Sequence, residues 1–490
     1  MTAAKSLRSR TALALLWSAL QNWSVKLLAL GLFVVLARLL SPSEMGVAAA
    51  VLLVLAAAAI VAELGLPDAI VRSPRLLPAH LDQAFLLALG VSLLAALALL
   101  SLPGPLAALA MGSDTPGAAA CLALAAPVPP LALVVAFQTA WRKQQLDFRS
   151  VARAGIAATL VSGAIGLALA AGGFGAASLV VQAGVAAGVA AVLLSRGSTW
   201  RPQARRDGAA LRALVRYGSG AMASRALDFL AARLVEVVVL AKLGVAGLGL
   251  YAVGSKLYLT LLQLLGGMLT DVATAALSKI VERREALAEQ YHRFVYLAAS
   301  TTLPVFVAVA ACAHELTALL FGARWAASAG TAQWLCLLGA VQVVQFFNGA
   351  LLAADGRAGW ILGINLTKVL AALAVLVALP AADTDALALH FLLSQLLVAP
   401  LSFWSVARVI RPDLGRLAQA LWPGLLAALC AAVSVAALRP LLADAGWPLL
   451  LRSVLLLAVF ALVHAAALLV LSRQRLFNEL RYLRLAWQER

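Results

Sequence analysis

Four charged residues interrupt one apolar stretch, 217–241, which is long enough to cross a bilayer. They are Arg225, Asp228, Arg233 and Glu236. At 100° per residue, all four fall on one helix face about 140° wide, and the i, i+3 spacing places a carboxylate near each arginine. Charges at the bilayer centre cost roughly 2.5–3.5 kcal/mol each, so they normally face a cavity or a partner. The pattern predicts a polar wall of an aqueous cavity, with simple mutual neutralisation of the two pairs as the alternative.

Three lysines also lie within apolar stretches, and they are Lys26, Lys256 and Lys368. Arginine and lysine side chains pair well with phosphate oxygens. We therefore expect these lysines, together with Arg225 and Arg233, to hold an anionic group such as a diphosphate or an acidic sugar.

The carboxylates of Glu236 and Asp228 are the candidates for ion coupling. A carboxylate beside a cation can exchange partners when a proton or a metal cation arrives, and this would stabilise one of two conformations relative to the other. We expect no catalytic residue, no resident metal and no cofactor; a proton or sodium gradient is the energy source that the residues suggest.

The composition requires these residues to be positioned by membrane helices. Of the 490 residues, 63% are apolar and 12% are charged, whereas soluble domains have about half apolar and a quarter charged residues. This composition excludes a water-soluble enzyme and a disordered chain. The excess of basic residues lies between apolar runs, which indicates membrane topology and not nucleic-acid binding.

Fourteen stretches have the length and apolarity of a membrane helix, which needs about 20 residues. The predicted spans are 12–37, 46–66, 84–102, 118–139, 152–171, 174–195, 217–241, 249–271, 294–312, 330–353, 359–379, 385–407, 419–438 and 449–471. The fourth is broken by Pro127, and the fifth and sixth are separated only by glycines near 172–175. The predicted fold class is an all-α integral membrane protein.

The distribution of basic residues predicts the orientation of these spans. With the N-terminus in the cytoplasm, 28 of the 38 Lys and Arg residues fall in cytoplasmic segments, counting Arg153 at the start of the span 152–171. Four lie on the opposite side, namely Arg38, Lys242, Arg324 and Arg439. This bias follows the positive-inside rule, so we expect a multi-pass membrane protein with both termini in the cytoplasm.

A short internal similarity suggests two parallel repeats. The sequence LARL at 36–39 is followed by Gly46, and LAKL at 240–243 is followed by Gly249. The cations of the two stretches are separated by six predicted spans, and an even number of spans preserves orientation. The pattern predicts two pseudo-symmetric six-helix lobes related by an axis along the membrane normal, with a cavity between them and two additional C-terminal helices.

The predicted spans and the long basic segment between the sixth and the seventh define the domain organisation. We expect an N-terminal lobe (1–195), a basic cytoplasmic linker (196–216), a C-terminal lobe (217–408), two additional spans (409–472) and a basic cytoplasmic tail (473–490). Because the tail alternates arginine with leucine, tyrosine and tryptophan, we expect it to lie along the membrane surface.

The sequence offers little support for an enzyme. It contains no GxxxxGK[ST], HExxH or GxSxG motif, so it shows no built-in ATPase motor, zinc-hydrolase site or nucleophile elbow. A membrane-embedded glycosyltransferase or polymerase would need acidic residues on a sizeable outer loop. The longest predicted outer loops, 103–117 and 313–328, are short, so this class remains only as an alternative.

Several motifs along the chain resemble those of one known family. They are LARLLSPSEMG at 36–46, ELGL at 63–66, AIVR at 69–72, YG at 217–218, LAKLG at 240–244, LGLY at 248–251, LFGARWA at 320–326 and NGALL at 348–352. In this order they resemble the bacterial polysaccharide (Wzx-like) flippases of the multidrug/oligosaccharidyl-lipid/polysaccharide exporter superfamily. Similar proteins often carry an Asp where this chain has Val235.

The resemblance implies a two-lobe flippase of the bacterial inner membrane. It would move an undecaprenyl-diphosphate-linked oligosaccharide from the cytoplasmic to the periplasmic leaflet, coupled to an ion gradient. Its expected partners are the lipid-linked oligosaccharide and membrane lipids, with a polymerase and a chain-length regulator of the same pathway as further candidates. A lipid II-type flippase or an amphiphile exporter of the same superfamily is the alternative within transport. No nucleic acid and no enzymatic activity are expected.

Overall fold

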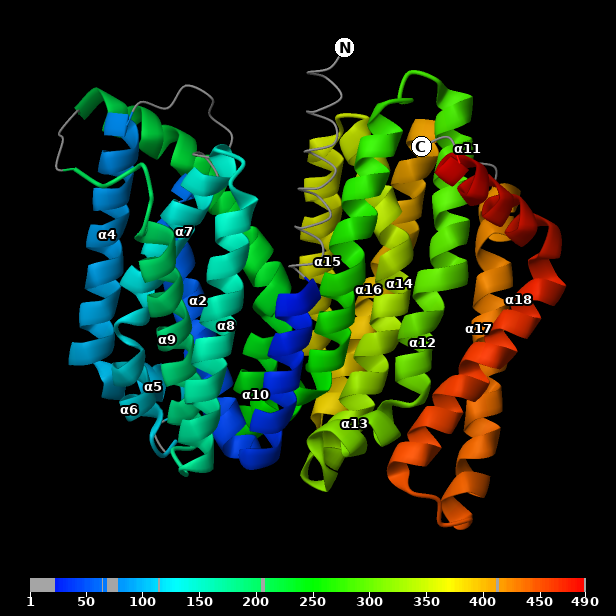
Figure 1. The fold of residues 1–490 in the computed structure, drawn as a ribbon, viewed down its shortest axis with the longest axis horizontal. Helices are drawn as coiled ribbons and strands as arrows, with labels where there is room; N and C mark the ends of the chain where they lie inside the picture. The colour runs from blue at the N-terminus through cyan, green and yellow to red at the C-terminus, as the bar shows by residue number, and fades with distance from the viewer. Residues whose placement is uncertain are drawn as a thin grey trace. The chain divides into compact units, whose positions relative to one another are not determined.

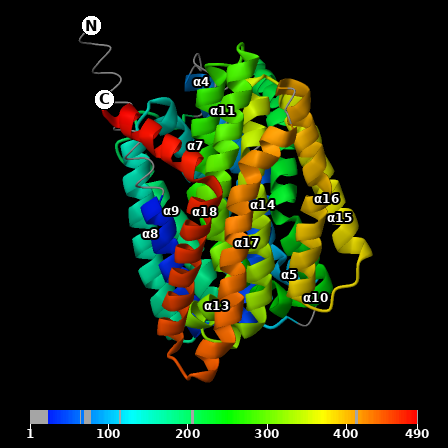
Figure 2. The same cartoon turned by 90° about the vertical axis from the view of Figure 1, so that its right-hand side faces the viewer.

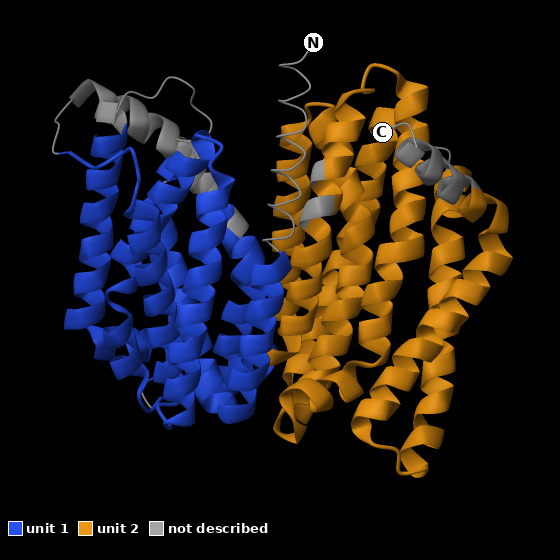
Figure 3. Cartoon of the chain, in the orientation of Figure 1, with its two compact units in different colours: residues 1–252 blue, residues 253–490 orange. Residues whose placement is uncertain are grey.

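The computed structural model describes most of the chain. Its backbone covers 23–63, 65–67, 78–112, 115–203, 208–410 and 414–488, and the side chains at 78–80, 208–226, 228, 267, 268, 271, 414 and 478–488 are outside the description. Every regular element in these ranges is a helix. By contacts, the chain divides into two compact units, residues 1–252 and 253–490 (Figure 3).

Unit 1 is a helical bundle that begins with a helix over 23–39. It continues with α2 (Pro42–Glu63), α4 (Pro78–Ser101), α5 (Pro103–Met111), α6 (Ala118–Ala125), α7 (Val128–Gln144), α8 (Phe148–Ala171), α9 (Ala176–Ser195) and the first part of α10 (Gly208–Ser278). Helix α9 packs on α2, α7 and α8, so it lies among the long helices of this unit (Figure 1).

Unit 2 contains the remainder of α10 and is arranged around one central helix. Its further elements are α11 (Arg284–Leu297), a π-helical turn η1 (Ala298–Thr302), α12 (Leu303–Ala311), α13 (Ala313–Phe321), a 3₁₀ turn η2 (Ala323–Ser328), α14 (Ala329–Ala354), α15 (Ala358–Ala378), α16 (Thr384–Ile410), α17 (Leu414–Asp444) and α18 (Leu449–Gln488). Helix α14 contacts α11, α12, α13, α15 and α16, while α17 pairs with α18 (Figure 2). In the most apolar part of the span that contains α14, 72% of the residues are buried, the largest share among the candidate spans.

The helices confirm the predicted multi-span fold. Twelve helices within the described residues are long and apolar enough to cross a membrane. One of them, Phe229–Gly266, covers two predicted spans, and the first predicted span begins outside the described residues. The predicted break at Pro127 separates α6 from α7, and the predicted glycine break separates α8 from α9.

The two spans within α10 are separated at Gly244. This residue has φ 68° and ψ −167°, inside an otherwise helical segment. Because a side chain disfavours this backbone conformation, glycine is the residue suited to it. The predicted boundary between the spans 217–241 and 249–271 therefore corresponds to a real interruption of the helix.

Two turns of identical design support the predicted internal repeat. Gln145 follows α7 and Asp355 follows α14, and both have φ −82° and ψ 4°. The next residues, Leu146 and Gly356, have positive φ values of 59° and 72°. Leu146 is the one non-glycine residue with positive φ in the described backbone. The repeated turn explains this exception, since the same chain path is used in both units.

The short helices α5 and α13 form a second pair of repeated elements. Each follows a membrane span and ends at a glycine, Gly112 or Gly322, with closely similar angles (φ 87°, ψ 156° and φ 96°, ψ 169°). Both glycine N–H groups donate to the carbonyl oxygen four residues earlier. The segments 103–117 and 313–328, expected to be simple loops, thus each contain a short helix.

The two motifs that suggested the repeat contact each other inside unit 1. A Cβ on Gly46 would overlap the carbonyl oxygen of Val245, and one on Gly249 would overlap that of Pro42. Gly46 lies four residues after Pro42, and Gly249 lies four residues after Val245. Each glycine therefore meets the residue that stands four positions before the other glycine. Such reciprocity is the signature of a two-fold contact, formed here by backbone against backbone.

This contact also explains where the compact units divide. Because the segment of α10 up to Ala252 packs on α2, the division by contacts falls within α10. The predicted lobes, which meet at the linker 196–216, were defined by the internal repeat, whereas the two compact units are defined by contacts. Those lobe boundaries stay a prediction.

Candidate functional site

The charged stretch of α10 contains the ion pair that its spacing predicts. Arg233 Nη1 lies 2.7 Å from Glu236 Oε1, one helical turn away. The Arg233 side chain is 42% exposed and that of Glu236 is 17% exposed, so the arginine remains accessible while the carboxylate is mostly covered. The side chains of Arg225 and Asp228 lie outside the described residues, and their pairing stays a prediction.

Lys368 on α15 lies in a buried group of polar side chains in unit 2. Its Nζ donates a hydrogen bond of 2.6 Å to Oε1 of Gln345 on α14. Gln395 on α16 places its Nε2 3.5 Å from the carbonyl oxygen of Lys368. Both glutamines are only 6% exposed. Three neighbouring helices therefore direct polar groups to the same place.

The amide of Gln345 has an unused donor in this group. Because an ammonium must bind the amide oxygen, the Nε2 group of Gln345 points elsewhere, and it has no hydrogen-bond partner among the described residues. A buried donor without an acceptor costs about 1–3 kcal/mol. Lys368 and Gln345 together thus offer donors to an oxygen-rich ligand such as a phosphate, a carboxylate or a sugar.

Two other polar side chains of α14, those of Gln342 and Asn348, accept hydrogen bonds from neighbouring helices. Tyr258 donates a hydrogen bond of 2.7 Å to Gln342, and Tyr291 donates one of 2.6 Å to Asn348. Asn348 in turn donates to Ser402 over 2.9 Å. These bonds tie α14 to α10, α11 and α16, so Gln342 and Asn348 hold the bundle together, whereas Gln345 retains a free donor.

The remaining predicted cations are half-buried. Lys26 lies on the helix over 23–39 in unit 1, and Lys256 lies on α10 in unit 2. Unit 1 thus contains Lys26 with the Arg233–Glu236 pair, and unit 2 contains Lys256 with Lys368. The gathering of all the predicted cations around one cavity stays a prediction.

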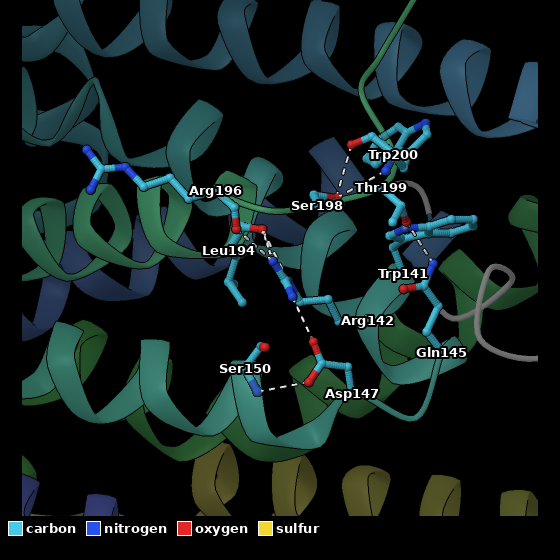
Figure 4. Close-up of polar contacts among 10 residues, drawn as sticks. All are labelled: Trp141, Arg142, Gln145, Asp147, Ser150, Leu194, Arg196, Ser198, Thr199 and Trp200. Carbon is cyan, nitrogen blue, oxygen red and sulfur yellow. Dashed lines mark hydrogen bonds and ion pairs between the residues drawn. The ribbon is translucent and has the colours of Figure 1, made fainter.

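A buried arginine anchors the ends of three helices in unit 1 (Figure 4). Arg142 is 7% exposed and donates to Asp147 over 2.8 Å. It also donates to the carbonyl oxygens of Leu194 (2.9 Å), in the last turn of α9, and Arg196 (3.0 Å), directly after that helix. Asp147 caps α8 through the N–H of Ser150. Arg142 therefore fixes the α7–α8 turn and the end of α9.

The Asp147 carboxyl gives this cluster a pH dependence. Burial alone would raise its pKa, but the hydrogen bonds from Ser150 and Arg142 and the arginine charge outweigh burial and lower it. A lowered pKa adds stability that is present above the ordinary pKa and is lost as the pH falls through the folded-state pKa. We expect Asp147→Asn, which keeps a capping side chain, to remove about 1 kcal/mol at neutral pH. In thermal melts between pH 7 and pH 3, the melting temperature of the Asp147→Asn variant should fall less steeply with decreasing pH than that of the unsubstituted chain. The same pH dependence in both proteins would contradict this role of Asp147.

A second buried charge cluster, which the sequence does not reveal, lies in unit 2. Glu315 on α13 is 1% exposed. Its Oε1 lies 2.9 Å from Arg439 Nε on α17 and 3.8 Å from Arg452 Nη2 on α18. Arg439 also donates to the carbonyl oxygen of Ala311. One carboxylate thus joins the short helix α13 to both C-terminal spans.

These features define a multi-pass helical membrane protein with two similar halves and buried polar groups within its spans. Comparison with solved structures finds the same fold. The chain is similar to the lipid II flippase MurJ in its inward closed conformation, with a TM-score of 0.72 and 12% identity over 94% of this chain and 100% of that one. It is similar to an inward-facing MATE family transporter of the MOP superfamily, with a TM-score of 0.61 and 14% identity over 79% and 94%.

The chain belongs to the polysaccharide biosynthesis protein family, whose model matches residues 35–330. Among curated proteins it is 24% identical to the lipopolysaccharide biosynthesis protein WzxC of Escherichia coli (strain K12), over 41% of this chain and 40% of that one. It is 24% identical to a membrane protein in the cps region of Klebsiella pneumoniae, over 31% of each. The matches thus span about a third to two fifths of these relatives. Together with the fold, they confirm the resemblance to the polysaccharide flippases.

Proposed function

We propose that this chain translocates a lipid-linked oligosaccharide, joined to its polyprenyl carrier by a diphosphate, across the bacterial inner membrane. The product would supply lipopolysaccharide, exopolysaccharide or capsule synthesis. The observation that carries this proposal is the family match over residues 35–330. The proposed orientation has both termini in the cytoplasm, as the distribution of basic residues predicts.

The buried donors of unit 2 support an anionic or sugar substrate. Lys368 donates a hydrogen bond to Gln345, and the amide of Gln345 has a donor that no described residue satisfies. A diphosphate or an acidic sugar would supply the missing acceptors. Lys26, Lys256, Arg225 and Arg233 are the further proposed substrate cations.

The reciprocal glycine contact supports alternating access. Helices α2 and α10 pack backbone against backbone at Gly46 and Gly249. Since no side chains interlock at such a contact, the two helices can separate and pack together again. We assign this contact to the closed gate at the side away from the basic loops. A conformation in which it is broken would open the substrate site to that side.

Ion coupling is proposed at Glu236, with Asp228 as the second candidate. Glu236 is held by Arg233 at 2.7 Å. Binding of a proton or a sodium ion would release the arginine to the substrate, which would make the stability of one conformation depend on the ion gradient.

Two alternatives are separated by experiment. The MurJ-like fold favours a lipid II-type flippase as the second candidate, and a membrane-embedded glycosyltransferase or polymerase is the candidate from another class. Deletion of the gene should abolish surface polysaccharide and accumulate lipid-linked oligosaccharide that remains accessible from the cytoplasm. Arrest of peptidoglycan synthesis would favour the lipid II reading, and accumulation of shortened oligosaccharides would favour a transferase.

The Lys368 site allows a sharper test. Loss of a charged hydrogen-bond donor at a buried site costs about 1.5–3 kcal/mol, so we expect Lys368→Ala to slow transport of the lipid-linked oligosaccharide roughly 10- to 100-fold. Lys279→Ala removes an exposed lysine at the end of α10 and serves as the matched control. The measurement is complementation of surface polysaccharide at equal membrane abundance. Normal transport by the Lys368 variant would exclude this residue from the substrate site.

A further inference from the structure

Helix α18 changes direction where it leaves its membrane span. Ser472 has non-helical angles (φ −144°, ψ 33°) and interrupts the helix. Its hydroxyl lies 2.9 Å from that of Tyr296 on α11, and both residues are buried. Beyond the interruption, Arg475 lies 5.9 Å from the centre of the Tyr296 ring and donates to the carbonyl oxygen of Gln419 on α17. Arg475, at the start of the basic tail, therefore lies against α11 and α17.

Arg475 lines one side of a basic cavity. The cavity has a volume of about 370 Å³, and α11, α17 and α18 all line it. Its lining includes Glu289, His292, Arg293, Arg416, Gln419 and Arg475. Three guanidinium groups stand against one carboxylate, so the lining has a net positive charge. Since guanidinium groups match phosphate oxygens in shape and charge, this chemistry suits a phosphate.

We expect the cavity near the boundary of the bilayer because of where its residues lie along the candidate membrane spans. Its residues belong to the ends of three candidate membrane spans, Arg284–Ala311, Gly415–Asp444 and Leu449–Phe477. A phospholipid phosphate occupies this depth in a membrane. A basic pocket between helices at this depth is typical of sites for acidic lipid headgroups.

An adjoining cavity gives room for the remainder of a lipid. It has a volume of about 420 Å³ and shares Gln419 and Arg475 with the first, and Arg473 also lines it. Trp422 and Val470 form part of its wall and are 44% and 83% exposed. Apolar side chains thus stand beside the guanidinium groups of Arg473 and Arg475 in this second cavity, which suits a headgroup followed by acyl chains.

We propose that this cavity binds the phosphate of an acidic phospholipid and holds the basic tail against α11 and α17. The same phosphate chemistry occurs in a polyprenyl diphosphate carrier. The exposed apolar wall on α17 and α18 favours the bilayer phospholipid, and the experiment separates the two sources. The proposal goes beyond the transport function and does not depend on it.

The test measures lipid binding to the purified full chain. Native mass spectrometry during titration with phosphatidylglycerol, phosphatidylcholine or a polyprenyl diphosphate would give an affinity for each lipid. Each basic residue near a membrane surface contributes roughly a fivefold gain in affinity for an acidic lipid. The triple variant Arg293→Gln, Arg416→Gln, Arg475→Gln should therefore bind phosphatidylglycerol roughly 100-fold more weakly, with unchanged binding of phosphatidylcholine.

A charge-matched control uses exposed cations of the same unit that do not line the cavity. Lys279→Gln, Arg283→Gln, Arg408→Gln removes the same charge and should bind phosphatidylglycerol within about threefold of the unsubstituted chain. Equal losses in both triple variants, or none in the first, would overturn the site. Tighter binding of polyprenyl diphosphate than of phosphatidylglycerol, lost in the first variant, would overturn the phospholipid assignment. If the first triple variant does not fold, the single variant Arg475→Gln applies the same test with a fivefold expectation.

Discussion

Gly249→Leu should reduce transport at least tenfold while the protein still inserts into the membrane. A side chain at this position would overlap the carbonyl oxygen of Pro42, which belongs to the backbone and cannot rotate away. Overpacking of a tight contact costs roughly 1–3 kcal/mol or more. This cost falls only on the conformation in which α2 and α10 meet, so the population of that conformation should drop correspondingly. A transporter that cannot close on one side cannot complete its cycle.

The measurement is transport activity together with the accessibility of the contact. In a Cys430→Ser background, which removes the exposed cysteine, a cysteine at the buried position Met45 reports whether the contact is open. Gly249→Leu should increase its labelling. Gly155→Leu is the control, because a Cβ at this position of α8 meets nothing within 4 Å. Full transport by the Gly249 variant, or equal loss in the control, would show that the contact is not a gate.

Glu315→Ala should be the most destabilising single substitution in the C-terminal part of unit 2. Removing one partner of a buried ion pair typically costs about 3–5 kcal/mol, because the remaining charge is left uncompensated. In this case Arg439 and Arg452 would both lose the carboxylate that joins their helices to α13. We expect the melting temperature of the purified protein to fall by roughly 5–10 °C.

A double-mutant cycle separates the ion pair from a general loss of packing. If the pair carries the effect, Glu315→Ala combined with Arg439→Ala should be less destabilising than the sum of the two single variants. Glu282→Ala, on an exposed residue before α11, should change the melting temperature by less than about 1 °C. Additive effects of the Glu315 and Arg439 substitutions would contradict the ion-pair account.

Most of the fold could be predicted from the sequence because each membrane helix is recognisable from its own run of apolar residues. A run of about 20 apolar residues is sufficient to identify a span, and Pro127 and Gly244 interrupt the helices at positions where the sequence places breaks. The repeat was visible as the motifs around Gly46 and Gly249. That these glycines contact each other could not be foreseen, since the contact depends on how α2 and α10 pack.

In the candidate site, contacts between residues near in sequence could be predicted, whereas contacts between residues on different helices could not. Arg233 and Glu236 are three residues apart on one helix, so helical geometry alone predicts their pair. Lys368 and Gln345 lie on different helices, and no periodicity connects them. Glu315 was hidden because the segment 313–328 was expected to be a loop, whereas α13 buries this carboxylate. Tertiary packing, which a single sequence does not display, decides these cases.

The most direct test of the proposed function is a flipping measurement on the purified chain in proteoliposomes. A fluorescent polyprenyl-diphosphate-linked oligosaccharide would be supplied in one leaflet, and its arrival in the other would be followed by quenching. We expect transfer that depends on the chain, that is faster than transfer of a lipid II-type substrate, and that is lost in Lys368→Ala but retained in Lys279→Ala. No transfer above protein-free liposomes, or chemical conversion of the substrate in place of transfer, would contradict the proposed flippase.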